Sequence, residues 1–150
     1  MTEPTEYEAL GVRLEEDAVW DSPEKSSTRV IGRISPDLRP FVPIVVQGIN
    51  GQERKIPVLL STGFQEALLL PAAKVAALGL PQTGTQSVTF PDGSQIDATV
   101  HPAKILLAGE AVDVDILAGG HEPRMGLALL QGYRFSMKFS VGEAINIQRL

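Results

Sequence analysis

The sequence predicts an all-β fold with one or two short helices, and three observations support this prediction. Eleven prolines and fourteen glycines among 150 residues imply many turns. The apolar runs are short and about ten residues apart, which is typical of a sandwich or a barrel. Aromatic residues make up only 5% of the chain. A single domain with a core of Leu, Val, Ile and Ala is therefore expected.

The sequence pattern of the first half of the domain predicts several strands followed by one helix. Residues 27–34 can form an outer strand before the proline-rich segment 36–43. Asn50-Gly51 lies between two apolar runs, which is the strongest short-range signal for a β-hairpin. Further on, Pro71 suits the first turn of a helix and Gly79 its end, so residues 71–79 are predicted to be helical.

The second half contains two more predicted hairpins and the closing strands. Pro91-Asp92-Gly93 separates the runs of the first hairpin, and Gly109-Glu110 separates those of the second. Residues 126–132 form either a helical turn or a buried strand. Residues 133–139 alternate ring and polar side chains, which predicts one buried face, and residues 144–150 alternate in the same way. The chain thus holds eight or nine short strands.

Charge divides the chain into an acidic N-terminal segment, residues 1–25 (the head), and a nearly neutral remainder, residues 26–150 (the body). Residues 1–25 contain eight acidic and two basic side chains, a net charge of −6, whereas the remaining ten acidic and eleven basic side chains give +1. We expect residues 1–28 to be a flexible acidic extension and residues 29–150 to be the folded domain. Because the head carries apolar anchors such as Leu14 and Trp20, it is alternatively a docking segment that lies over a groove.

Composition excludes several classes of function. The absence of cysteine removes disulfides and thiolate chemistry, and it suits a reducing cytoplasm. No apolar run approaches the length needed to span a bilayer, and no signal peptide is recognisable. The body lacks a basic stripe for nucleic acid. We expect no cofactor, no metal, no nucleic acid and no membrane partner.

Two conventional catalytic interpretations fit the residues poorly. Ser61 follows an apolar strand, but its surroundings are not Gly-x-Ser-x-Gly. The available bases, His101 and His121, lie in turn-like contexts and are expected to be surface loop residues. Asp113 and Asp115 share one face of a strand, where two carboxylates more often keep an edge soluble than bind a cation.

One group of motifs remains, beginning with the turn at Ser61-Thr62-Gly63. It resembles the bacterial single-domain retropepsin-like aspartic protease family, whose members are relatives of the retroviral proteases. In that family a strand delivers Asp-Thr-Gly or Asp-Ser-Gly. Here Thr62, Gly63 and Phe64 match that turn, and residues 67–80 match the segment that follows. The hairpin from Phe90 to Ser94 looks like the flap that closes over a substrate. Met125-Gly126 resembles the hydrophobic-Gly element that packs behind the catalytic turn. The resemblance covers roughly residues 30–150.

The resemblance implies a closed β-barrel, a homodimer and a peptide or protein substrate. Its catalytic turn is Ser61, Thr62 and Gly63. Its substrate-binding residues are Phe64, Phe90, Pro91, Asp92, Gly93, Met125 and Gly126. Aspartic proteases need two carboxylates that share one proton, and this chain carries one such turn, so a second copy must supply the other. The C-terminal strand is a candidate for the sheet between the two subunits.

The chain departs from the family at the residue that performs the chemistry, because position 61 is Ser. A hydroxyl holds no negative charge at physiological pH and cannot act as a general base without help. We therefore expect peptide hydrolysis to be absent or greatly reduced. Either the serine is natural and the protein is a pseudoprotease, or it replaces an aspartate by design. The alternative function is a non-catalytic peptide-binding module that uses the same groove and flap.

Overall fold

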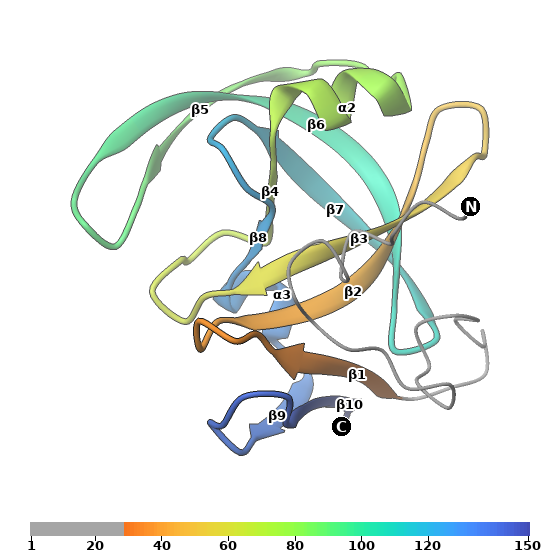
Figure 1. Ribbon diagram of the computed structural model, residues 1–150. Helices are drawn as coiled ribbons and strands as arrows, with labels where there is room; N and C mark the ends of the chain where they lie inside the picture. The colour runs from red at the N-terminus through yellow and green to blue at the C-terminus, as the bar shows by residue number, and fades with distance from the viewer. Residues whose placement is uncertain (1–28) are drawn as a thin grey trace, which may run out of the picture.

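The computed structural model describes residues 29–150, which form a curled β-sheet with two short helices (Figure 1). The predicted extension 1–28 lies outside the described residues. The elements follow one another as β1 (Arg29–Ile34), β2 (Pro40–Gln47), β3 (Glu53–Leu60), β4 (Leu68–Leu70), α2 (Ala72–Leu78), β5 (Gly84–Thr89), β6 (Gln95–Leu107), β7 (Glu110–Ala118), β8 (Arg124–Met125), α3 (Leu127–Leu130), β9 (Tyr133–Met137) and β10 (Ala144–Arg149).

The sheet runs in the order β5-β6-β7-β4-β8-β3-β2-β1-β10-β9, and a further pairing between β6 and β2 joins it into a ring. Six strands form this ring, from β6 through β7, β4, β8 and β3 to β2. The ring is uneven, because β4 has three residues and β8 two, whereas β6 has thirteen. The predicted all-β, barrel-like fold is confirmed.

The three predicted hairpins are present. β2 pairs with β3, β5 with β6, and β6 with β7, each antiparallel. One expectation was wrong: the sequence placed His101 in a turn-like context, but β6 runs without interruption through His101-Pro102. A proline lacks an amide donor for a sheet hydrogen bond. Pro102 nevertheless lies opposite Asp115 in the regular β6–β7 register, so the strand continues through it.

The helix predicted at residues 71–79 is present and has a local cause. Pro71 precedes α2 with a φ of −54°, and Gly79 ends the helix in the left-handed conformation, donating its N–H to the Ala76 carbonyl. Val75 and Leu78 are the buried side chains of α2. Of the two alternatives left open for residues 126–132, the structure shows a single helical turn, α3.

Within residues 29–150 the core contains two clusters, which lie on opposite faces of the short strand β4. Leu68, Leu70 and Met125 point into the main core inside the ring. Leu69, between Leu68 and Leu70 in sequence, points the other way and joins a smaller cluster next to the β5–β6 hairpin, formed with Phe64, Val88, Ala98 and Leu117. Alternation along a strand thus gives β4 two buried faces.

The closing strands differ from expectation in two respects. β10 pairs with β1 on one edge and with β9 on the other, so neither edge is open to form a sheet with a second subunit. The sequence predicts one buried face for β9. Tyr133 and Met137 are half-buried against the core, but Phe135 between them is 37% exposed because β9 is the last strand of the sheet.

Candidate active site

Ser61 lies at the end of β3, where the chain leaves the sheet and turns. Val58 and Leu60 point into the core, so Leu59 and Ser61 face the other side. The Ser61 carbonyl accepts a hydrogen bond from the Phe64 amide at 3.3 Å, which closes the turn. Ser61 is half-buried, whereas the two residues that follow it are exposed and Phe64 is fully buried. The turn therefore presents its polar residues on a fixed backbone.

The segment Met125-Gly126 holds this turn in place through the backbone. The Ser61 amide donates to the Met125 carbonyl at 2.9 Å, and Leu127 donates to the Phe64 carbonyl at 2.9 Å. Gly126 donates to the Ala67 carbonyl at 3.1 Å. A Cβ on Gly126 would collide with the carbonyl oxygens of Phe64 and Glu66, so only glycine permits this approach. The sequence-predicted residues Ser61, Phe64, Met125 and Gly126 thus form one unit.

The β5–β6 hairpin contacts the same turn. An ideal Cβ on Gly63 would lie 2.9 Å from the Pro91 Cγ, which places the hairpin tip directly against the turn. The rings of Phe64 and Phe90 stack with their centroids 6.5 Å apart. The two segments predicted to form the catalytic turn and the flap are therefore neighbours, although they are well separated in sequence.

The tip of the hairpin is a tight turn organised by Asp92. Phe90 and Ser94 are joined by a backbone hydrogen bond of 2.8 Å, and Gly93 takes a φ of +86° that side chains other than glycine rarely adopt. The Asp92 carboxylate accepts hydrogen bonds from the hydroxyl and the amide of Ser94 at 2.6 and 2.9 Å. These two bonds, with the side-chain bond the larger cause, lower the pKa of Asp92 below its usual value.

Acidification is expected to loosen this turn. Because the folded-state pKa of Asp92 is lowered, its bonds to Ser94 stabilise the turn above the ordinary carboxyl pKa and are lost as the pH falls through the folded value. The amide resonances of Gly93 and Ser94 should shift with that pKa in an NMR titration. Asp92→Asn keeps an acceptor oxygen but removes the titration, so its resonances should stay constant. A persistent shift in that variant would contradict the assignment.

A pocket of about 590 Å³ lies beside the hairpin. Its lining combines the apolar side chains of Leu69, Phe90 and Ile96 with polar groups from the β7–β8 loop and the hairpin tip. Arg124 is its basic side chain, and its guanidinium carbon lies 5.6 Å from the centre of the Phe90 ring. Since Arg124 alternates with buried Met125, it shares the face of the sheet on which Ser61 lies.

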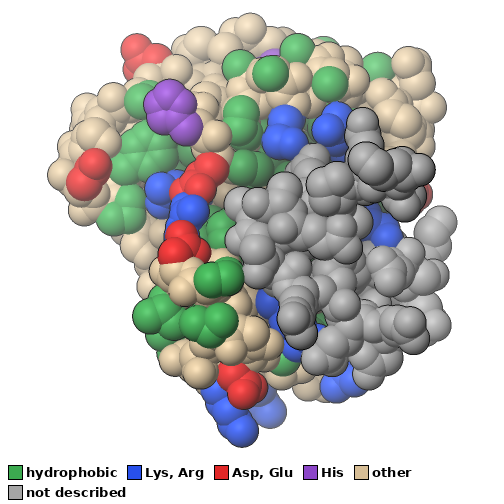
Figure 2. Space-filling view, viewed as in Figure 1, with side chains coloured by type: hydrophobic (Ala, Val, Ile, Leu, Met, Phe, Trp, Pro, Cys, Tyr) green, Lys and Arg blue, Asp and Glu red, His purple; other side chains and the backbone are tan. Residues whose placement is uncertain are grey.

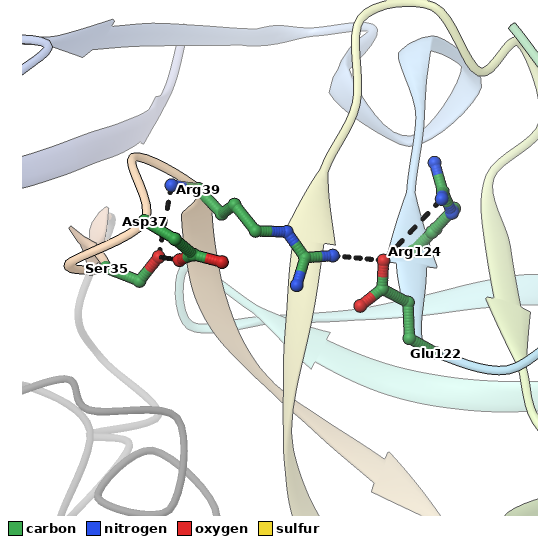
Figure 3. Close-up of polar contacts among 5 residues, drawn as sticks. All are labelled: Ser35, Asp37, Arg39, Glu122 and Arg124. Carbon is green, nitrogen blue, oxygen red and sulfur yellow. Dashed lines mark hydrogen bonds and ion pairs between the residues drawn. The ribbon is translucent and has the colours of Figure 1, made fainter.

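Arg124 belongs to a charged network that the sequence did not reveal. Glu122 on the β7–β8 loop forms ion pairs with Arg124, at 3.5 Å, and with Arg39, which immediately precedes β2 (Figure 3). Ser35 donates to Asp37 and also accepts from the Arg39 amide, which fixes the β1–β2 turn. Basic and acidic side chains alternate in a line on one face of the molecule (Figure 2). The network ties β2 to β8 next to the Ser61 turn.

Removing the shared carboxylate should have a modest effect on stability. Glu122→Gln leaves two guanidinium groups without their common partner, and we expect a loss of about 1 kcal/mol in the free energy of unfolding. Glu110→Gln is the matched control, because its single pair with Arg149 is more exposed and should matter less. Chemical denaturation of both variants measures the difference. Equal losses would show that sharing one carboxylate adds nothing.

The structure corrects the prediction for His101. The sequence suggests a surface loop, but His101 lies within β6 and is 8% exposed. Its Nδ1 lies 2.9 Å from the Leu80 carbonyl, which only accepts, so Nδ1 carries the proton. In the neutral ring Nε2 then accepts from the Thr99 hydroxyl at 2.7 Å. Both ring nitrogens therefore have structural partners. His121 is exposed, as expected, and lines the pocket.

The candidate cation ligands do not assemble. Asp113 forms an ion pair with Lys104 at 3.1 Å on the exposed face of β7. Within residues 29–150, no group of three or more His, Asp or Glu side chains is arranged to hold a metal ion. Neither helix of the described region is long and apolar enough to cross a bilayer.

Comparison with known proteins supports the fold. No protein-family model and no curated protein matches the chain. Among solved structures, the chain is similar to a retropepsin-like aspartic protease from Rickettsia conorii, with a TM-score of 0.54 and 15% sequence identity. The match covers 81% of this chain and 90% of that one. At this identity the likeness establishes architecture, and this chain therefore has the fold of a retropepsin-like aspartic protease.

Proposed function

We propose that this protein is a retropepsin-like aspartic endopeptidase domain that binds extended peptides as a homodimer, with hydrolysis disabled at Ser61. One observation carries the proposal. The Ser61-Thr62-Gly63 turn is bound through its backbone to Met125 and is contacted at Gly63 by the hairpin tip at Pro91. A fixed polar turn beneath a hairpin is the arrangement needed to hold a peptide over reactive groups.

The homodimer follows from the chemistry of this class of site. Aspartic proteolysis uses two carboxylates, one as base toward water and the other as acid toward the substrate carbonyl. The chain supplies one turn of this kind, so a two-fold axis passing beside Ser61 has to supply the second. Thr62 and Gly63, both exposed in the single chain, then face the partner across the axis.

The remaining site residues divide by their exposure. Pro91, Asp92 and Gly93 are exposed at the hairpin tip and would contact the peptide. Phe90 is half-buried and links the flap to Phe64. Phe64 and Met125 are fully buried, so their role is to support the turn from below. Gly126 permits the close backbone approach.

Ser61 sets the limit on activity. Its hydroxyl can hydrogen-bond a water but offers no carboxylate to remove a proton from it, and two copies give two hydroxyls. The turn accommodates this small polar side chain whether it is natural or replaces an aspartate. The direct test is cleavage of a peptide library by the protein and by Ser61→Asp. Activity that appears only with aspartate supports the proposal.

A second candidate function is peptide binding without chemistry. It is favoured by the pocket beside the flap, where apolar side chains surround Arg124. An extended segment placed between flap and floor would gain backbone hydrogen bonds from the hairpin. Binding of labelled library peptides to the Ser61 protein, with no turnover even by Ser61→Asp, is the result that selects this function over the first.

A further inference from the structure

The outer face of β1, β2 and β3 is apolar at its centre and basic at its margin. Partner residues on neighbouring strands place Arg33 beside Phe41, Phe41 beside Leu59, and Leu59 beside Arg124. This row crosses four strands. Leu59 is two residues before Ser61, so the face continues directly to the candidate catalytic turn.

Alternation along the strands defines the rest of this surface, which we call the outer face. The core takes every second residue of β1, β2 and β3, which leaves the others pointing outward. The outward residues are Arg29, Ile31, Arg33, Phe41, Pro43, Val45, Gln47, Glu53, Lys55, Pro57 and Leu59. Three of them are basic and one is acidic, so the outer face has a net charge of +2. Arg39 adds another guanidinium 5.3 Å from the Phe41 ring centre.

The apolar residues of the outer face are buried without belonging to the main core. Phe41, Val45 and Leu59 are 3%, 6% and 9% exposed, and within residues 29–150 they belong to neither of the two core clusters. A mostly apolar pocket of about 240 Å³ lies at the end of the face remote from Ser61, lined in part by Val45, Leu106 and Ala111. The outer face therefore combines a buried apolar centre with a neighbouring apolar pocket.

We propose that the occupant of this interface is the acidic segment 1–28 of the same chain. Its first 25 residues carry a net charge of −6, opposite to that of the outer face. Its apolar residues Leu10, Leu14, Val19 and Trp20 match the apolar centre. The segment joins the domain at Arg29, which is itself on the outer face.

Length and connectivity favour the chain's own segment over that of another copy. Twenty-eight residues can span roughly 90 Å when extended, far more than the roughly 27 Å length of an eight-residue strand. Tethering gives the segment a local concentration in the millimolar range, so weak contacts are enough to hold it. Its attraction to the face depends on charge and is therefore sensitive to salt.

Trp20 makes docking measurable, because it is the single tryptophan of the chain and lies in the segment. The full-length protein should show blue-shifted Trp20 emission and protection from acrylamide, both relative to a synthetic peptide of residues 1–28. Arg29→Glu combined with Lys55→Glu reverses two charges of the outer face and should return both signals to those of the peptide. High salt should do the same.

The matched control is Arg134→Glu combined with Lys138→Glu, which makes the same charge change on exposed residues near β9. This variant should retain the protection, and circular dichroism verifies that both variants are folded. Emission and quenching of the full-length protein equal to those of the peptide would overturn the proposal. Protection that appears only at protein concentrations where the chain dimerises would also overturn it, because the occupant would then belong to the second copy.

Discussion

Replacing Ser61 by Asp is expected to raise peptide cleavage by at least roughly 10²–10⁴-fold, the usual contribution of a positioned acid or base. The reason is chemical. The turn is already fixed by the bonds of Ser61 to Met125 and of Phe64 to Ser61, so the substitution adds a carboxylate to a formed site. In a dimer, two such carboxylates cannot both ionise easily, and they share a proton.

Ser61→Asn is the control for this experiment. Its side chain has the size and shape of aspartate but does not titrate near neutral pH, so its activity should stay at the level of the Ser61 protein. The Ser61→Asp activity should follow a bell-shaped pH profile, because one carboxyl must be charged and the other protonated. Cleavage by the Ser61 protein at the rate of Ser61→Asp would refute the mechanism.

Gly126→Ala should destabilise the fold by about 4 kcal/mol or more, a range typical of severe steric or packing defects. The added Cβ would collide with the backbone oxygens of Phe64 and Glu66. Relief requires the Ser61–Ala67 loop to move away from β8, which breaks the bonds that hold the turn. Both the free energy of unfolding and peptide binding should fall.

Gly84→Ala is the matched substitution, since no atom lies within 4 Å of a Cβ at that position and its φ is not positive. Its effect should be neutral or slightly stabilising, because alanine restricts the unfolded chain. Thermal or urea unfolding of the two variants gives the comparison. A loss below about 1 kcal/mol for Gly126→Ala would mean that the contact between turn and β8 is looser than the structure indicates.

Local signals were enough to predict most of the fold. Asn50-Gly51, Pro91-Asp92-Gly93 and Gly109-Glu110 each marked a hairpin, because turn geometry depends on residues adjacent in sequence. Pro71 and Gly79 bounded α2 for the same reason. The errors arose where contacts between residues far apart in sequence determine the local structure. Neighbouring strands hold β6 extended through Pro102, and they enclose β10 on both edges.

The candidate site was predictable only where its residues are contiguous in sequence. The turn at Ser61-Gly63 and the element at Met125-Gly126 were recognisable as motifs, and the structure brings them into backbone contact. Arg39, Glu122 and Arg124 were not identified from the sequence as site residues. The ion pair of Arg39 with Glu122 joins positions 83 residues apart, and no local sequence pattern predicts such a contact. His101 was misjudged since its partner, the Leu80 carbonyl, lies 21 residues earlier.

The central claim is that two Ser61 turns meet at a two-fold axis, and cysteine cross-linking tests it most directly. The chain has no cysteine, so Ser61→Cys introduces a single thiol. A disulfide needs Cα atoms roughly 4.4–6.8 Å apart. We predict rapid formation of a covalent dimer under mild oxidation, whereas Ala77→Cys on the exposed side of α2 stays largely monomeric. Cross-linking of Ser61→Cys no faster than that of Ala77→Cys would contradict the account.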